Sequence, residues 1–309
     1  MRRPLRVRAP ALLTAAALAT LAAAAGAPPA AAGELLYTGT LSGASGDYTL
    51  SEETTSVLLL TGLSYRTERW RLSGSIPLIY QDTPFLSYAG GTPVPTGRRF
   101  GDGSGMDGDG NGDGGGNGSR SDRGRGPVIV PDPDTLDFSE TGVGDPLLRV
   151  DLEIARGGGS TAGVFASVKP PLADEDSGFG TGEWDAGGGV TFSRRAGAGL
   201  LLVELAYWSF GDLPDLELED PFAASLAYGR PVGGGAVSWL AAVSGFTETL
   251  DGADGPVELS LTFSRQRPEG GRRLSLTVAA GLTETAADGR VALGWSVGKS
   301  REPAGAYRP

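Results

Sequence analysis

Three segments near the end of the chain decide the fold class: VELSLTFS (257–264), LSLTVAAGL (274–282) and VALGWSVG (291–298). In each segment, large apolar side chains alternate with small or polar ones. Successive side chains of a β-strand point to opposite faces of the sheet, so a period of two predicts strands. The same alternation recurs along the chain and predicts twelve strands, at residues 34–42, 55–66, 70–81, 143–155, 160–169, 183–193, 198–210, 222–230, 236–249, 257–265, 273–282 and 289–298.

The composition of the two strand faces separates two all-β folds. A soluble sandwich exposes a polar face to water, with residues such as Lys, Glu, Thr and Gln. Here the polar face consists largely of Gly, Ser, Thr and Ala, whereas the apolar face carries Leu, Val, Trp, Phe and Tyr. Large apolar side chains toward lipid and small ones toward a lumen are typical of a transmembrane β-barrel. We therefore predict a single up-and-down antiparallel transmembrane barrel of about twelve strands.

The connections between the predicted strands alternate in length and charge. The even-numbered connections are short and mostly basic. The odd-numbered ones are mostly long and acidic: 43–54, 82–140, 170–182, 211–221, 250–256 and 283–288. If both termini of an outer-membrane barrel lie in the periplasm, its longer loops are extracellular. The alternation therefore predicts that the acidic loops face outward and the basic turns face the periplasm.

The first residues are typical of an export signal. Arg2, Arg3, Arg6 and Arg8 precede an Ala/Leu-rich stretch at 11–25 and a run of small residues that ends at Ala32. This is the order of a secretory signal peptide. A membrane anchor is the alternative, but the apolar stretch is shorter than the roughly 20 residues of a spanning helix. We expect a signal peptide at 1–32 and a barrel at 33–309, with outer-membrane lipid and the barrel-assembly machinery as partners.

The composition excludes most hydrolase and metalloenzyme mechanisms. The 309 residues contain no His and no Cys, so no imidazole base and no thiolate is present. Ser and Asp alone lack the base that a hydroxyl nucleophile requires. We therefore expect neither catalysis nor a cofactor. The net charge of −11 also argues against nucleic acid as a partner, because phosphate binding needs a basic surface.

A low-complexity segment at 90–127 lies within the predicted outer loop at 82–140. Its composition favours a solvated, extended loop. A second interpretation is a calcium site, because oxygen-bearing residues recur with the spacing of an EF-hand loop at Asp107, Asp109, Asn111 and Asp113. Gly118 stands where the bidentate Glu of such a loop belongs. The solvated loop is therefore the favoured interpretation, with the calcium site as the alternative.

Strand parity places a set of charged residues on the predicted inner face: Arg149, Asp151, Glu153, Lys169, Glu183, Asp185, Glu204 and Glu258. Twelve strands lie between the eight-stranded barrels that side chains fill and the sixteen-stranded porins that are open. Acids outnumber bases in this set, which would favour cations or the polar groups of a solute in a narrow lumen. The alternative is that these charges pair across the strands and fill the interior.

Three short motifs follow the stretch from Trp70 to Pro77. They are Gly142-Val143-Gly144-Asp145, Val168-Lys169-Pro170 and a Gly180-Thr181-Gly182 run that leads into Trp184-Asp185. Their order resembles the outer-membrane transporters named for the MetA pathway of phenol degradation, and a neighbouring group of uncharacterised outer-membrane barrels is nearly as similar. The resemblance implies a channel or transporter for small hydrophobic or aromatic solutes. A non-transporting surface-interaction barrel with acidic, cation-binding loops is the alternative.

Overall fold

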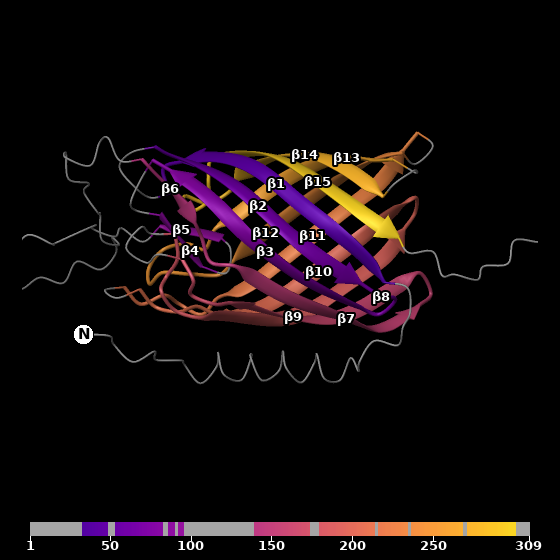
Figure 1. Cartoon of the computed structure of the whole chain (residues 1–309), viewed down its shortest axis with the longest axis horizontal. Coiled ribbons are helices and arrows are strands. Elements are labelled where there is room, and N and C mark those ends of the chain that lie inside the picture. Colours follow the sequence, from indigo (N-terminus) through magenta and orange to yellow (C-terminus); the bar gives the residue numbers. More distant parts are fainter. Residues whose placement is uncertain are drawn as a thin grey trace, which may run out of the picture.

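The alternating segments form strands that close into a ring. The computed structural model describes residues 33–48, 53–82, 86–89, 92–95, 139–173, 179–213, 216–233, 236–267 and 271–300. Its wall consists of twelve antiparallel strands, counting β6 and β7 as one (Figure 1). They are β1 (Glu34–Gly46), β2 (Thr54–Arg66), β3 (Trp70–Gln81), β6 (Glu140–Val143) with β7 (Leu147–Gly157), β8 (Ser160–Lys169), β9 (Asp185–Ala196), β10 (Gly199–Ser209), β11 (Phe222–Val232), β12 (Val237–Phe246), β13 (Val257–Arg267), β14 (Arg272–Gly281) and β15 (Gly289–Ser300).

The ring is closed by the first and last strands. Each strand pairs with the next in antiparallel register, and β15 pairs with β1, where Thr40 lies opposite Gly294. A closed barrel has no free sheet edge, so the strands of the wall have a hydrogen-bonding neighbour on both sides; the short β6 is the exception among the described residues and pairs with β3 alone. The predicted all-β barrel of about twelve strands is confirmed.

The strand predicted at 143–155 is interrupted. It is split into β6 and β7 by residues 144–146, and β3 pairs with β6 up to Val143 and with β7 from Leu147. Pro146 has no N–H to give to a ladder, which explains why regular pairing stops there. Gly144 still donates a hydrogen bond of 2.9 Å to the carbonyl of Pro77. Asp145 therefore lies outside the regular strands, between β6 and β7.

A hairpin was missed in the region predicted as one loop, 82–140. It consists of β4 (Leu86–Ala89) and β5 (Thr92–Pro95), which form a separate two-stranded sheet. All four residues of β4 are buried. The first wall strand also extends to Gly46, beyond the predicted residue 42.

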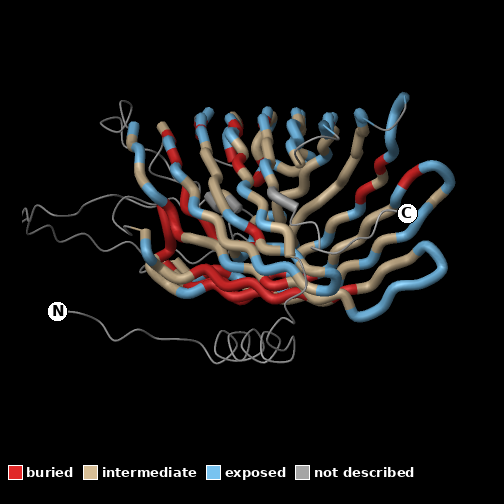
Figure 2. Tube along the Cα trace, turned by 45° about the vertical axis from the view of Figure 1, so that its right-hand side comes forward, coloured by how far each residue is buried: buried red, intermediate tan, exposed pale blue. Residues whose placement is uncertain are grey.

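The two faces of the wall differ as the alternation predicts. On β13, Phe263 is 48% exposed, whereas Ser264 beside it is 7% exposed. Exposed large apolar side chains lie on one face of β1, β2 and β3; Leu35, Leu63 and Leu72 are examples, one from each strand. Such an extended apolar surface is unstable in water and is suited to lipid. Buried positions instead gather toward one end of the barrel (Figure 2).

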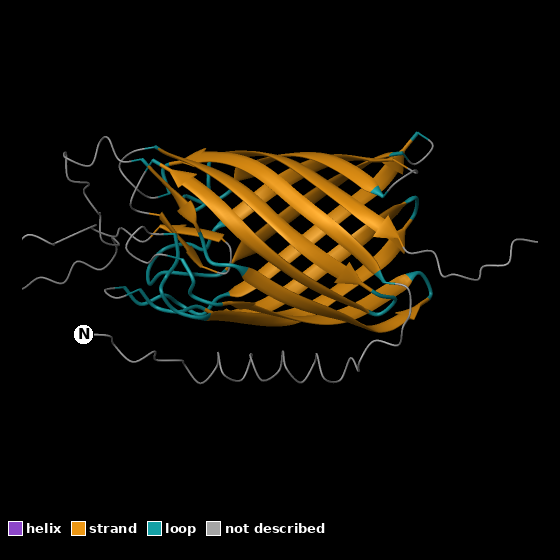
Figure 3. Cartoon of the chain, viewed as in Figure 1, coloured by secondary structure: helices purple, strands orange, loops and turns teal. Residues whose placement is uncertain are grey.

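The two ends of the barrel carry different connections (Figure 3). We call the end with the connections 47–53, 82–139, 170–184, 210–221, 247–256 and 282–288 the loop end, and the end with 67–69, 158–159, 197–198, 233–236 and 268–271 the turn end. At the turn end, Gly158 and Gly159 join β7 to β8 with φ of 59° and 77°, which glycine adopts without strain. No helix in the described ranges is long and apolar enough to cross a membrane.

Candidate functional site in the barrel interior

The interior carries charged pairs that join strands which are not neighbours. Arg149 on β7 donates to both carboxylate oxygens of Glu204 on β10, at 3.2 and 2.8 Å, across the intervening β8 and β9. Its guanidinium also lies 3.7 Å from the ring centroid of Phe165. A contact that skips two strands requires both side chains to point inward. The pair therefore spans part of the lumen and narrows it.

Two further carboxylates near this pair have partners on their own strand. Arg149 donates through Nε to Asp151 at 2.9 Å. Glu153 accepts a hydrogen bond of 2.5 Å from Arg156. Both carboxylates lie toward the turn end, because β7 runs from the loop end to Gly157. Their charges are thus partly neutralised by arginines.

Glu258 is paired elsewhere in the ring. Arg290 on β15 donates through Nε to Glu258 on β13 at 2.9 Å, across β14. On β14, Ala279 is the register partner of Arg290 and Gly281 is that of Glu258, and both residues are small enough to leave room for the contact. The predicted residue thus belongs to a second inward pair, separate from the one around Arg149.

The remaining predicted residues form a buried cluster at the loop end. Lys169 lies 2.6 Å from Asp145 and 3.3 Å from Asp185, and all three side chains are at most 2% exposed. Asp145 also accepts two backbone N–H groups at 2.7 Å, from Leu172 and Ala173. Asp185 accepts the N–H of Gly211 at 2.9 Å. Buried charges need this many partners because leaving them unpaired is costly.

The three short motifs of the sequence meet at this cluster. Thr181 and the backbone carbonyl of Glu183 each lie within 3.5 Å of the Lys169 ammonium. A Cβ added at Gly180 would lie 2.3 Å from Asp145, and one at Gly142 would lie 2.3 Å from the ring of Phe179. Two of the motifs therefore hold glycine at positions where a larger residue would clash. Glu183 takes part through its backbone, and its side chain lies outside the regular strands.

Apolar side chains fill the loop end of the interior. Phe165 of β8 and Trp208 of β10 belong to one buried cluster with Ala89 of β4, which places the β4–β5 hairpin within the barrel. Phe210 joins this cluster from the β10–β11 connection. A second cluster brings Tyr88 of β4 against Ile79 and Phe179. The interior is thus aromatic and packed at the loop end and polar toward the turn end.

Burial also affects two tyrosines at the loop end, both outside the strands of the wall. Burial raises the pKa of Tyr48 from its ordinary value near 10 to about 12. Burial likewise raises the pKa of Tyr88 on the β4–β5 hairpin. Both phenols are therefore neutral at physiological pH.

The inner face holds more arginines than the sequence interpretation counted. By register, Arg290 shares the inward face with Ala44 and Ala279. By the same register argument, the side chains of four other arginines also face inward: Arg66, Arg71, Arg195 and Arg273. They were missed because they stand at strand ends, beyond the clearest alternation. With them the interior has no marked excess of acid.

Two predictions fall outside the described residues. The signal peptide at 1–32 is one, and the proposed calcium ligands Asp107, Asp109, Asn111 and Asp113 are the other. In the part of the chain that the structure describes, no group of three or more acidic side chains is arranged to hold a metal ion.

Comparison with solved structures identifies the fold. An outer membrane channel from Pseudomonas putida F1 superposes with a TM-score of 0.57 at 13% sequence identity, covering 88% of this chain and 97% of the channel. A KdgM porin in complex with oligogalacturonate gives a TM-score of 0.43 at 4% identity, covering 87% and 99%. The CymD monoaromatic hydrocarbon channel gives 0.39 at 9% identity, covering 95% and 91%.

The first of these similarities shows a shared fold. It extends over almost the whole length of both chains, so the barrel found here has the architecture of an outer-membrane channel. The sequence matches no family profile and no curated protein. The resemblance to the MetA-pathway transporters is therefore not confirmed by sequence comparison.

Proposed function

We propose that this protein is an outer-membrane channel or transporter for small solutes, hydrophobic or aromatic ones among them. One observation carries the proposal. A closed barrel with an apolar exterior encloses an interior that is polar at the turn end and packed with aromatic side chains at the loop end. A wall of this kind is suited to lipid, and its interior is the remaining route for a solute.

The location in the outer membrane follows from the same argument. The P. putida protein of like fold is an outer membrane channel, which supports placing this barrel in the same membrane. Residues 1–32 would direct export, and the barrel-assembly machinery would insert residues 33–309. The predicted orientation puts the loop end outside the cell and the turn end in the periplasm.

The proposal that the solutes are hydrophobic or aromatic rests on the aromatic side chains at the loop end. Phe165, Trp208 and Phe210 offer ring faces to an apolar compound, and the loops that carry them would have to shift to admit it. The convergence of the three short motifs on Lys169 supports the resemblance to the MetA-pathway transporters. It gives those motifs one shared structural role.

The charged residues of the interior would then line the route without selecting cations. Arg149, Asp151, Glu153, Glu204 and Glu258 each have an ionic partner, and Lys169 and Asp185 are buried in the cluster. Paired charges cancel much of each other's field, so they favour neutral or singly charged solutes over small cations.

Conductance tests the channel directly. Purified protein is inserted into planar lipid bilayers, and uptake of phenol and toluene is compared between cells with and without the gene. We expect discrete conductance steps and slower uptake in the deletion strain. A folded barrel that never conducts, together with unchanged uptake, would contradict the proposal.

That negative outcome would favour a surface-interaction barrel. Exposed acids at the loop end, such as Glu248, Asp251 and Asp254, together with the proposed calcium loop at 107–113, give this alternative its basis. Calorimetric titration with calcium, repeated on the D107N/D109N variant, would test it separately from transport.

A further inference from the structure

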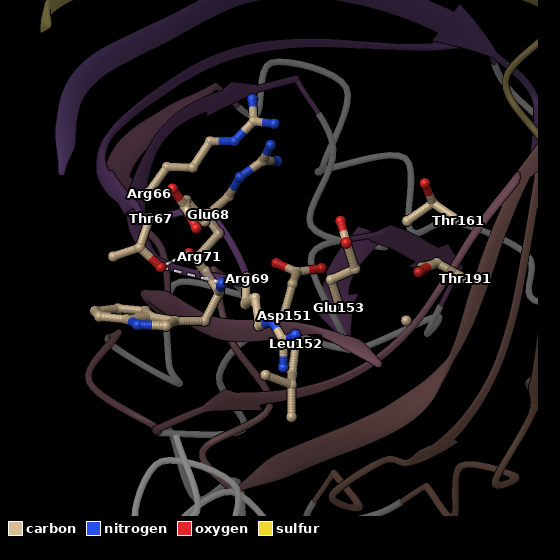
Figure 4. A pocket seen from close by; sticks show the side chains of 12 residues that line it. Arg66, Thr67, Glu68, Arg69, Arg71, Asp151, Leu152, Glu153, Thr161 and Thr191 are labelled. Atoms are coloured by element: carbon tan, nitrogen blue, oxygen red, sulfur yellow. Dashed lines mark hydrogen bonds between the residues drawn. The ribbon is translucent and has the colours of Figure 1, made fainter. Parts of the chain in front are cut away.

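A small open pocket of about 180 Å³ lies at the turn end of the lumen (Figure 4). One wall is the β2–β3 hairpin, from which Arg66 and Arg71 extend. The facing wall is the inner side of β7, β8 and β9, with Asp151, Glu153, Thr161 and Thr191. Figure 4 shows Arg66 and Arg71, with Glu68 beside them, on one side of the pocket and Asp151, Glu153, Thr161 and Thr191 on the other.

The two arginines form an unusual pair. Arg66 and Arg71 are direct partners in the β2–β3 register and lie on the inward face, so two positive charges stand opposite each other. Like charges in this position destabilise a sheet. Within the described residues, neither guanidinium forms an ion pair or a hydrogen bond with another side chain. Glu34 on β1 lies opposite Arg66 in the strand register, but the two side chains form no ion pair.

The carboxylates across the pocket do not neutralise this pair. Asp151 is bound to Arg149 and Glu153 to Arg156, at 2.8 and 2.5 Å. The hairpin wall also carries Arg69 and the carboxylate of Glu68, so it keeps a net positive charge, and the facing wall offers hydrogen-bonding oxygens that are already balanced by arginines. A ligand that matches it carries one negative charge at one end and a hydrogen-bond donor at the other.

We propose that this pocket binds a small organic hydroxy acid as a monoanion. The guanidinium groups of Arg66 and Arg71 would receive its carboxylate, since planar forks of N–H groups match carboxylate geometry. Asp151, Glu153 and the two threonines would accept a hydrogen bond from its hydroxyl. The two carboxylates would also disfavour a second negative charge at that end of the ligand. The inference deepens the proposed channel function, on which it rests, by giving the periplasmic mouth a preference for anionic solutes.

Calorimetric titration of the folded barrel in detergent micelles tests the site. The probes are 4-hydroxybenzoate, phenol, which lacks the carboxylate, and inorganic phosphate, which carries more charge. We expect 4-hydroxybenzoate to bind at least about tenfold more tightly than either of the others, and R66Q/R71Q to weaken it at least about tenfold. Heat-dependent gel migration verifies that each variant is folded.

The matched control is R194Q/R230Q. These two arginines also lie near the turn end and are exposed, but their register places them on the outward face, so the variant removes the same charge outside the pocket. It is expected to bind like the wild type. Absence of binding, equal binding of phosphate, or undiminished binding by R66Q/R71Q would each overturn the proposal. Binding through these arginines in a barrel that never conducts would instead refute only the channel function.

Discussion

Lys169 on β8 lies 2.6 Å from Asp145, which stands in the break between β6 and β7, and each side chain is 2% exposed. Asp185, at the start of β9, completes the cluster at 3.3 Å from the same ammonium. Through Asp145 the cluster also binds the backbone of residues 172 and 173. The cluster around this lysine therefore joins the break between β6 and β7 to two loop-end connections, 170–184 and, through Asp185 and Gly211, 210–221.

Replacing this lysine is expected to destabilise the barrel strongly. Lys169→Met leaves two buried carboxylates uncompensated, and breaking a buried pair in this way costs about 3–5 kcal/mol. The measurement is the midpoint of thermal unfolding in detergent micelles, followed by circular dichroism and gel migration. The triple variant K169M/D145N/D185N should recover much of the loss, because it removes the unpaired charges as well.

Arg156→Met is the control for that experiment. The ion pair of Arg156 with Glu153 is exposed on the arginine side, and an exposed pair contributes little. No measurable change in the unfolding midpoint is expected. If K169M also unfolds like the wild type, the cluster does not anchor the loop end.

The packed loop end predicts a variant that conducts more. Phe210 is 1% exposed and lies 6.2 Å, centroid to centroid, from both Trp208 and Phe246. Phe210→Ala removes the ring that joins them, so we expect larger single-channel conductance and a loss of about 3–5 kcal/mol in stability. Phe222→Ala, at a side chain that is 63% exposed on the outward face, should change neither. Equal conductance of the two variants would show that this cluster does not close the lumen.

Much of the wall could be predicted from the sequence because strand alternation is a local property. The period of two at 257–264 depends only on neighbouring residues, and the structure places a strand there. The break at 144–146 could not be predicted in the same way. Pro146 is a local signal that ends the ladder, but the alternation on both sides of it conceals the break, and the burial of Asp145 there depends on Lys169, a contact between residues 24 apart.

The interior was predicted less completely, for the same reason. Strand parity identified Glu258 as an inward residue. Its partner Arg290 lies two strands away, and although the predicted strand 289–298 includes Arg290, its alternation was counted only from Val291. The β4–β5 hairpin is short and carries no long alternation, and its burial results from contacts with β8 and β10. Such contacts between distant segments have no signature in the local sequence.

Alkaline pH should weaken the loop end. The pKa of Tyr48 is raised by burial to about 12, whereas an unfolded tyrosine titrates near 10. The unfolded chain therefore releases its proton first. The stability contributed by this group is complete below pH 10 and is lost as the pH rises toward 12. Unfolding midpoints measured across this range should fall in the wild type and fall less in Tyr48→Phe, which keeps the ring and removes the titrating hydroxyl. Equal slopes would refute this assignment.

The orientation of the barrel can be tested with single cysteines, because the chain has none of its own. Asp251→Cys places a thiol in the β12–β13 connection at the loop end, and Ala198→Cys places one in the β9–β10 turn; both positions are exposed. A membrane-impermeant maleimide should label D251C on intact cells. It should label A198C only after the outer membrane is permeabilised, because the turn end would face the periplasm. The reverse pattern would mean that the barrel is inserted with the loop end inward, and equal labelling in a soluble periplasmic extract would mean that it is not in the membrane.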